Sequence, residues 1–77
     1  MPNFEDQWRP ILINGERRLA TKSRTPSLVR DFDGVFFVDS PTLARRRTEQ
    51  HRLTRGATAH LEQGGRIKSG GNWYSLP

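Results

Sequence analysis

The sequence predicts a small α+β domain that occupies residues 1–77 as a single unit. Three observations support this fold class: two glycine-containing turn signals far apart in the chain, an apolar run between them, and a helical stretch after that run. A chain of 77 residues is long enough for one domain and too short for two. We therefore expect, in order, an N-terminal β-hairpin, a central buried strand, one amphipathic helix and a C-terminal β-hairpin.

The first expected element is a hairpin that turns at Asn14 and Gly15. These two residues stand between two short runs, 11–13 and 17–19, that can form the paired strands. Asn-Gly is a strong hairpin signal because both central positions of a type I′ turn need a positive φ. Residues 20–33 show no clear period and contain a proline, so we expect them to form a loop.

The central strand is expected over residues 34–38. This run is β-branched and aromatic after its glycine, and aspartates stand on both sides of it. A continuous apolar run of this length between turn residues is typical of a buried strand.

The longest expected element is a helix over residues 41–63, with Ser40 as its N-cap and Pro41 at its first position. At about 100° per residue, Arg45, Arg52 and Arg55 lie on the side opposite a narrow stripe of five other side chains: Leu43, Gln50, Leu53, Ala57 and Leu61. Gly56 costs about 1 kcal/mol inside a helix, so the sequence allows either one helix or two, 41–54 and 57–63.

Gly64 and Gly65 are expected to end this helix, because glycine readily adopts the left-handed conformation found at helix C-termini. A second hairpin follows, in which residues 66–69 and 72–76 flank a turn at Gly70 and Gly71.

The net charge of +5 lies entirely in the second half of the chain. Residues 1–40 carry six basic and six acidic side chains, whereas residues 41–77 carry seven basic and two acidic ones. A field of one sign attracts phosphate groups or acidic protein surfaces. Arginine, whose planar fork suits phosphate and carboxylate, supplies eleven of the thirteen basic residues, although a GC-rich genome would produce the same bias.

The candidate binding residues are the basic side chains of the expected helix and C-terminal hairpin, together with one tryptophan: Arg45, Arg46, Arg47, Arg52, Arg55, Arg66, Lys68 and Trp73. The alternative for the helix is a solvated face on which Glu49 pairs with neighbouring arginines. The alternative for Trp73 and Tyr74 is that they close a small core, although only one of two adjacent strand residues can point inward.

Several classes of function are not expected. The chain has no cysteine, and its two histidines, His51 and His60, lack companions at metal-ligand spacing, so we expect no metal site. No nucleophile–base pair and no phosphate-binding loop is recognisable, so we expect neither an enzyme nor a cofactor. No apolar run exceeds about five residues. We therefore expect a soluble, monomeric, cytoplasmic protein without a membrane or small-molecule partner.

Residues 57–77 resemble the end of a winged-helix domain. Leu61, Gly64, Ile67 and the glycine pair at 70–71 stand where that family ends a helix and forms a basic hairpin, the wing. The resemblance implies that Arg66 and Lys68 lie near phosphate groups. The sequence departs from the family upstream, where residues 1–34 predict a hairpin and a loop in place of two helices.

The size, charge and lack of catalytic residues also resemble, in kind, small bacteriophage proteins that bind the host RNA polymerase. This resemblance implies a non-enzymatic transcription regulator that binds host polymerase, adjoining nucleic acid, or both. Two alternatives remain at this point. One is a winged-helix-like regulator that inserts the 41–63 region into the DNA major groove, and the other is an assembly or inhibitor protein that contacts only protein.

Overall fold

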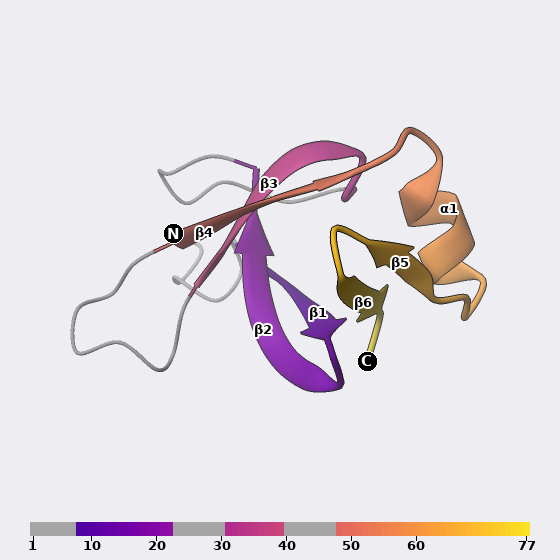
Figure 1. The fold of residues 1–77 in the computed structure, drawn as a ribbon, viewed down its shortest axis with the longest axis horizontal. Coiled ribbons are helices and arrows are strands. Elements are labelled where there is room, and N and C mark those ends of the chain that lie inside the picture. The colour runs from indigo at the N-terminus through magenta and orange to yellow at the C-terminus, as the bar shows by residue number, and fades with distance from the viewer. Residues whose placement is uncertain (1–7, 23–30, 40–47) are drawn as a thin grey trace, which may run out of the picture.

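A computed structural model describes residues 8–22, 31–39 and 48–77, which form a six-stranded antiparallel sheet and one short helix (Figure 1). The elements are β1 (Arg9–Ile13), β2 (Glu16–Thr21), β3 (Gly34–Asp39), β4 (Thr48–Leu53), α1 (Ala57–Glu62), β5 (Ile67–Ser69) and β6 (Asn72–Ser75). The strand order in the sheet is β4-β3-β2-β1-β6-β5, so β4 and β5 form its two edges. The sheet curls into a half-barrel, and the domain is mostly β with one short helix.

Both expected hairpins are confirmed. β1 and β2 pair across a turn in which Asn14 has φ 53° and Gly15 has φ 83°, as the Asn-Gly signal requires. β5 and β6 pair across Gly70 and Gly71, with Ser69 opposite Asn72 at the end of the ladder. The two hairpins join through β1 and β6, where Ile13 lies opposite Tyr74.

The central strand is also confirmed, as β3. It pairs with β2 on one side and with β4 on the other, so its backbone has partners on both edges. Phe36 and Val38 are fully buried, while the other residues of the strand are partly exposed. The expected loop at 20–33 begins later than predicted, because β2 continues through the buried residues Ala20 and Thr21; residues 23–30 lie outside the described residues.

The expected helix over 41–63 is wrong for its middle part. Residues 48–53 form strand β4, which pairs with all six residues of β3. Among the described residues the helix is α1 (Ala57–Glu62), which agrees with the second helix, 57–63, of the two-helix alternative. Gly56 precedes the helix with φ 90°, a left-handed conformation that separates strand from helix. The pairing of β4 with buried β3 outweighs the helical propensity of this segment, because tertiary contacts commonly override local propensity. The expected start at Ser40 and Pro41 lies outside the described residues, whereas Gly64, with φ 86°, follows the helix as expected.

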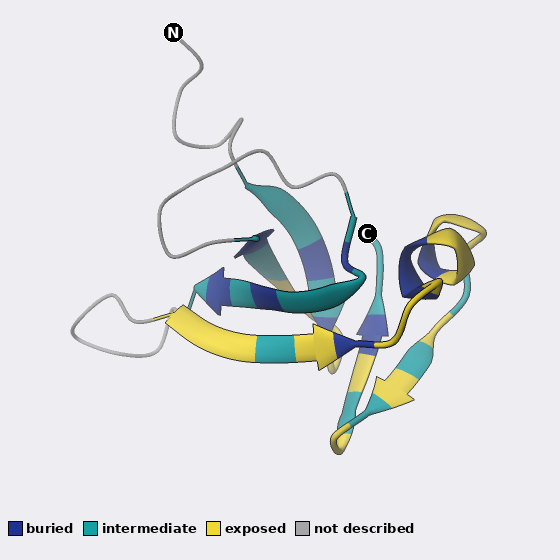
Figure 2. Cartoon of the chain, turned by 90° about the horizontal axis from the view of Figure 1, so that it is seen from above, coloured by how far each residue is buried: buried dark blue, intermediate teal, exposed yellow. Residues whose placement is uncertain are grey.

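The core lies on the concave side of the curled sheet, and α1 contributes buried residues to it from beside β5 (Figure 2). Its buried members are Ile11, Ile13, Ala20, Phe32, Phe36, Val38, Leu53, Ala57, Leu61 and Tyr74. The ring of Phe36 lies at its centre, in edge contact with Phe32 and Tyr74 at centroid distances of 5.5 and 6.4 Å. The same ring stacks on His51 at 5.8 Å. The aromatic residues therefore supply the middle of this small core.

Candidate nucleic-acid interface

The outer face of the β5–β6 hairpin presents an exposed tryptophan beside two cations. Trp73 is 44% exposed, and Lys68 lies directly opposite it in the strand register. The guanidinium carbon of Arg66 is 5.2 Å from the centroid of the Trp73 ring, and the ammonium nitrogen of Lys68 is 5.9 Å from it. Both distances are within the range of cation–π attraction. We call Arg66, Lys68 and Trp73 the hairpin face.

The backbone of Trp73 is fixed by Asn14, which lies at the turn of the other hairpin. The amide of Asn14 donates to the Trp73 carbonyl at 2.8 Å, and the Trp73 amide donates to the Asn14 side-chain oxygen at 2.9 Å. The Asn14 side-chain amide also donates to Oδ1 of Asn72 at 3.0 Å. These bonds hold the hairpin face in place against the rest of the sheet. From the sequence, Asn14 is recognisable only as a turn residue, and no local signal indicates this second role.

The ion pairs explain why the second half of the chain keeps its excess positive charge. Its two acidic residues bind arginines of the first half: Glu62 pairs with Arg9 at 2.9 Å, and Glu49 pairs with Arg18 at 3.2 Å. Among the described residues, no carboxylate then pairs with the four cations of β4, β5 and their neighbouring turns: Arg52, Arg55, Arg66 and Lys68. Glu49, which the alternative of a solvated helix face paired with neighbouring arginines, forms an ion pair with Arg18 of β2.

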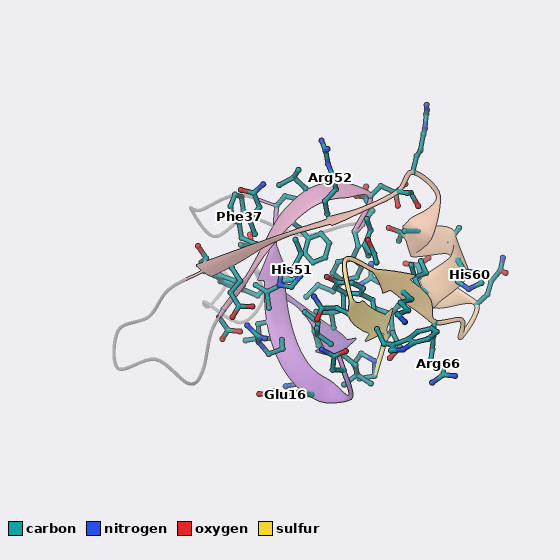
Figure 3. The ribbon with its side chains drawn as sticks, viewed as in Figure 1. Glu16, Phe37, His51, Arg52, His60 and Arg66 are labelled. Atoms are coloured by element: carbon teal, nitrogen blue, oxygen red, sulfur yellow. The ribbon has the colours of Figure 1, made fainter. Side chains whose placement is uncertain are left out.

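Five of the eight predicted binding residues are described by the structure, and three of these five come together as the hairpin face. Arg52 on β4 and Arg55 in the turn after it are exposed, and Arg52 points to a different side of the molecule from Arg66 (Figure 3). Arg45, Arg46 and Arg47 lie outside the described residues. As expected for adjacent strand residues, Tyr74 points inward and is 3% exposed while its neighbour Trp73 points outward.

A chain of hydrogen bonds behind the hairpin face joins β6 to β4. The hydroxyl of Tyr74 lies 2.6 Å from Nδ1 of His51, and Nε2 of His51 lies 3.3 Å from a carboxylate oxygen of Glu49. A carboxylate can only accept, so Nε2 of His51 donates to Glu49, and in a neutral ring Nδ1 then accepts from the Tyr74 hydroxyl. The sequence pattern indicated no role for His51 beyond a metal-binding one that was not expected, so this bridging role was not predicted.

Two pKa shifts follow from this arrangement. Partial burial acts to raise the pKa of Glu49, but hydrogen bonds from His51 and Arg18 outweigh it, and the pKa is lowered. Burial raises the pKa of the Tyr74 hydroxyl, against the hydrogen bond from Asn72 and with the negative charge of Glu49. The tyrosine therefore stays a neutral hydrogen-bonding group, and it is a poor candidate for a nucleophile or base.

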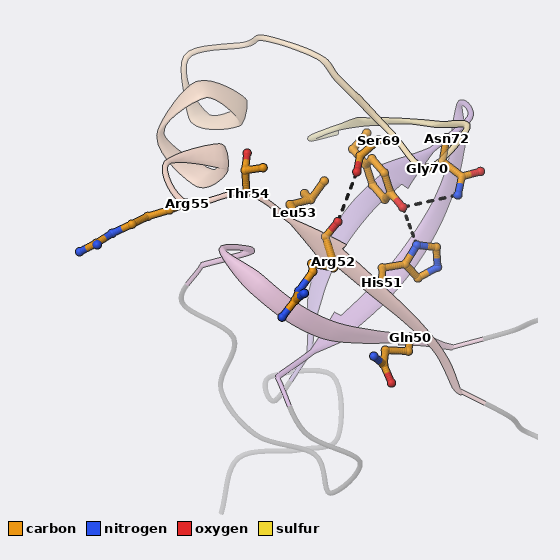
Figure 4. A pocket seen from close by; sticks show the side chains of 10 residues that line it. Gln50, His51, Arg52, Leu53, Thr54, Arg55, Ser69, Gly70 and Asn72 are labelled. Carbon is orange, nitrogen blue, oxygen red and sulfur yellow. Dashed lines mark hydrogen bonds between the residues drawn. The ribbon is translucent and has the colours of Figure 1, made fainter.

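A cleft of about 630 Å³ opens beside this chain, between edge strand β4 and the tip of the β5–β6 hairpin (Figure 4). His51, Leu53 and Tyr74 line it together with Ser69, Gly70 and Asn72 at the tip. The hydroxyl of Ser69 reaches across to the carbonyl of Arg52 at 3.5 Å. The cleft is therefore bounded by two strands whose outer edges have no neighbouring strand among the described residues.

A second polar cluster, centred on Asp33, holds the N-terminal end of α1 in place. The Asp33 carboxylate accepts bonds from the amides of Gly56 and Thr58, both at 2.9 Å, and from the Thr58 hydroxyl at 2.8 Å. The two backbone amides, followed by the Thr58 hydroxyl, lower the pKa of Asp33 from 3.8 to about 2. The Thr58 hydroxyl in turn accepts from the amide of Phe32 at 2.6 Å. Asp33 thus supplies the N-terminal cap that the helix lacks locally.

Within the ranges that the structure describes, there is no cluster of three or more metal-ligating side chains, and no helix is long and apolar enough to cross a membrane. No family model, curated protein or solved structure matches this chain. The resemblance of residues 57–77 to a winged-helix domain gains no support, because a β-sheet stands where that family has helices.

Proposed function

We propose that the protein is a non-enzymatic regulator of transcription that binds nucleic acid through the hairpin face. One observation carries the proposal: two cations lie over an exposed tryptophan ring, and no described carboxylate pairs with either of them. Three other basic side chains, Arg9, Arg18 and Lys22, form ion pairs with acidic side chains. Arg66 and Lys68 differ in that they are held in position with their charge unneutralised.

The three side chains suit contact with a phosphate backbone. A guanidinium presents a planar fork to phosphate oxygens, and an ammonium adds a compact positive charge next to it. An exposed indole beside these cations gives a base or sugar a flat apolar surface. Such contacts supply affinity with little dependence on base sequence, and they weaken as salt rises.

A second candidate function is docking on an acidic protein surface, with the RNA polymerase of a bacterial host as the proposed partner of a phage-encoded protein. Arg52 and Arg55 favour it, because both are exposed and pair with no described carboxylate, and Arg52 points to a different side of the molecule from Arg66 (Figure 3). A polymerase and the nucleic acid beside it would offer acidic partners on more than one side of so small a domain.

The test is a fluorescence anisotropy titration with labelled single-stranded and double-stranded oligonucleotides at several salt concentrations. We expect the double variant Arg66→Ala and Lys68→Ala to lower the slope of log affinity against log salt by about 2, because two phosphate contacts are lost. Trp73→Ala should weaken binding with little change in that slope. Arg17→Ala is the matched control, since it removes an exposed cation from strand β2.

Two results would reject nucleic-acid binding by the hairpin face: equal affinities for the double variant and the control, or affinity that does not change with salt. A pull-down from bacterial lysate with and without nuclease separates the two candidate functions. Retention of RNA polymerase after nuclease treatment supports protein docking, whereas retention that disappears with nuclease supports direct binding of nucleic acid.

A further inference from the structure

We propose that edge strand β4 accepts an extended acidic peptide from a partner protein as an added strand, seated in the cleft between β4 and the β5–β6 hairpin. This inference concerns a different surface from the hairpin face and does not depend on nucleic-acid binding. Peptides that add a strand to an exposed sheet edge gain affinity from main-chain hydrogen bonds and specificity from pockets for alternate side chains. Both features are present at β4.

The backbone of β4 offers the hydrogen bonds. The Arg52 carbonyl receives the Ser69 hydroxyl from the hairpin side, so it points away from β3 and into the cleft (Figure 4). Alternate residues of an antiparallel strand direct their amide and carbonyl groups to the same side. Gln50, two residues earlier, therefore presents its own amide and carbonyl to the cleft. The Ser69 contact, at 3.5 Å, is longer than a good O–H···O bond and is easily exchanged for a peptide amide.

The cleft offers the pocket. Its volume of about 630 Å³ lies over Leu53, His51 and Tyr74, which are the inward residues of β4 and β6. Leu53 and Tyr74 are almost fully buried, and the His51 ring is held between the Tyr74 hydroxyl and Glu49. The floor is thus built from one aliphatic and two aromatic side chains, and such a surface suits apolar side chains at every second position of an added strand.

The charge around the cleft selects an acidic peptide. Arg52 and Arg55 are exposed at the β4 side and pair with no described carboxylate. The one acidic residue of β4, Glu49, is already occupied by Arg18 and His51. An added strand would thus meet two available cations next to its outward side chains. The matching sequence alternates acidic residues, which face the arginines, with apolar residues, which enter the cleft.

The probe is a fluorescein-labelled synthetic peptide of about eight residues in which glutamate alternates with leucine and phenylalanine. We expect saturable binding by anisotropy, and a peptide of the same composition in scrambled order should bind at least tenfold more weakly. The decisive variant is Gln50→Pro. Its ring removes an amide that points to the cleft and not to β3, so the sheet can form, and proline is tolerated at such edge positions. We expect at least tenfold weaker peptide binding and an unchanged circular dichroism spectrum.

The charge requirement is tested with a matched pair of variants. Arg52→Glu should weaken peptide binding at least tenfold, whereas Arg17→Glu, which makes the same change of charge at an exposed position on β2, should leave it unchanged. Equal loss for both would show attraction by net charge alone and would overturn the inference. Equal binding of the ordered and scrambled peptides would also overturn it, as would dimerisation through β4 without any peptide binding.

The two proposals fail separately. Folded Gln50→Pro protein should bind oligonucleotides as the wild type does, because the hairpin face is unchanged. Loss of oligonucleotide binding in the variant with Arg66→Ala and Lys68→Ala, with peptide binding retained, supports both proposals. Peptide binding in a protein that binds no oligonucleotide leaves the strand-addition inference standing and rejects the hairpin face. Wild-type oligonucleotide binding without peptide binding supports the hairpin face and rejects strand addition at β4.

Discussion

The hydroxyl of Tyr74 lies 2.6 Å from Nδ1 of His51, and this contact joins strand β6 to strand β4 across the open side of the half-barrel. The two strands are not neighbours in the sheet, where β3, β2 and β1 separate them. The contact is almost enclosed, since Tyr74 is 3% exposed and the His51 side chain 9%. It therefore limits how far the cleft can open.

Tyr74→Phe should destabilise the fold by about 1–2 kcal/mol, because it keeps the ring but leaves Nδ1 of His51 without its donor. The measurement is chemical denaturation followed by tryptophan fluorescence. We also expect faster hydrogen exchange in β4, since the edge strand loses its tie to β6. A free energy of unfolding equal to that of the wild type would show that the contact carries no stability.

Phe36→Ala should cost about 3–5 kcal/mol, because it removes a fully buried ring at the centre of the aromatic core. A loss of this size is comparable to the whole stability expected of so small a domain. Phe37→Ala is the matched comparison, because its side chain is only partly buried on the same strand. Thermal melts should show no cooperative transition for the first variant and a clear one for the second. Similar melts would mean that Phe36 does not organise the core.

The stability of the protein should fall between about pH 4 and pH 2 through Asp33. Its pKa is about 2 in the folded state, against 3.8 ordinarily, so the stabilising contribution of the carboxylate is complete above pH 4 and is lost as the pH falls toward 2. Asp33→Asn removes this titration and disturbs the cap of α1. We expect the variant to be less stable at neutral pH and to lose less on acidification. A parallel pH dependence of the two proteins in urea titrations would contradict this assignment.

Replacement of Arg45, Arg46 and Arg47 by alanine should leave folding almost unchanged and weaken partner binding at least tenfold. These residues lie outside the described residues, and the expectation rests on the charge of the sequence. A comparison with the double variant Arg66→Ala and Lys68→Ala in the same titration shows which of the two groups of basic residues contributes more to the affinity. Loss only in the triple variant would move the main contact from the hairpin face to residues 45–47.

Local signals predicted the hairpins and the central strand, and a long-range requirement defeated the helix prediction. The turn at Asn14 and Gly15 is specified by its own two residues, whose positive φ values need no distant partner. Residues 48–53 include good helix formers, yet they form a strand that pairs with β3. Without this pairing, the buried strand β3 would have hydrogen-bonding partners on one side only. No window of this segment alone contains that information.

The binding residues divide in the same way. Alternation along β6 predicted that only one of Trp73 and Tyr74 faces outward. Arg66 and Lys68 were selected by their charge and by their place in the expected C-terminal hairpin. The destinations of Glu49 and Glu62 were not predictable, because their partners, Arg18 and Arg9, lie in the first half of the chain. The sequence shows the excess of positive charge in the second half of the chain. The ion pairs between distant residues determine which of the basic side chains are left without an acidic partner among the described residues.

The strand order has a consequence for how the protein is made. Strand β1 is completed by β6, and the Asn14 side chain bonds to Asn72, 58 residues later. The first hairpin leaves the ribosome long before β6 is synthesised. Until then, the edge of β1 that pairs with β6 has unpaired backbone amides and carbonyls. Folding can finish only after the last hairpin has emerged, and a shortened chain lacking Asn72–Ser75 would expose the same flank permanently. Slow translation or truncation should therefore favour aggregation and degradation over a partly active product.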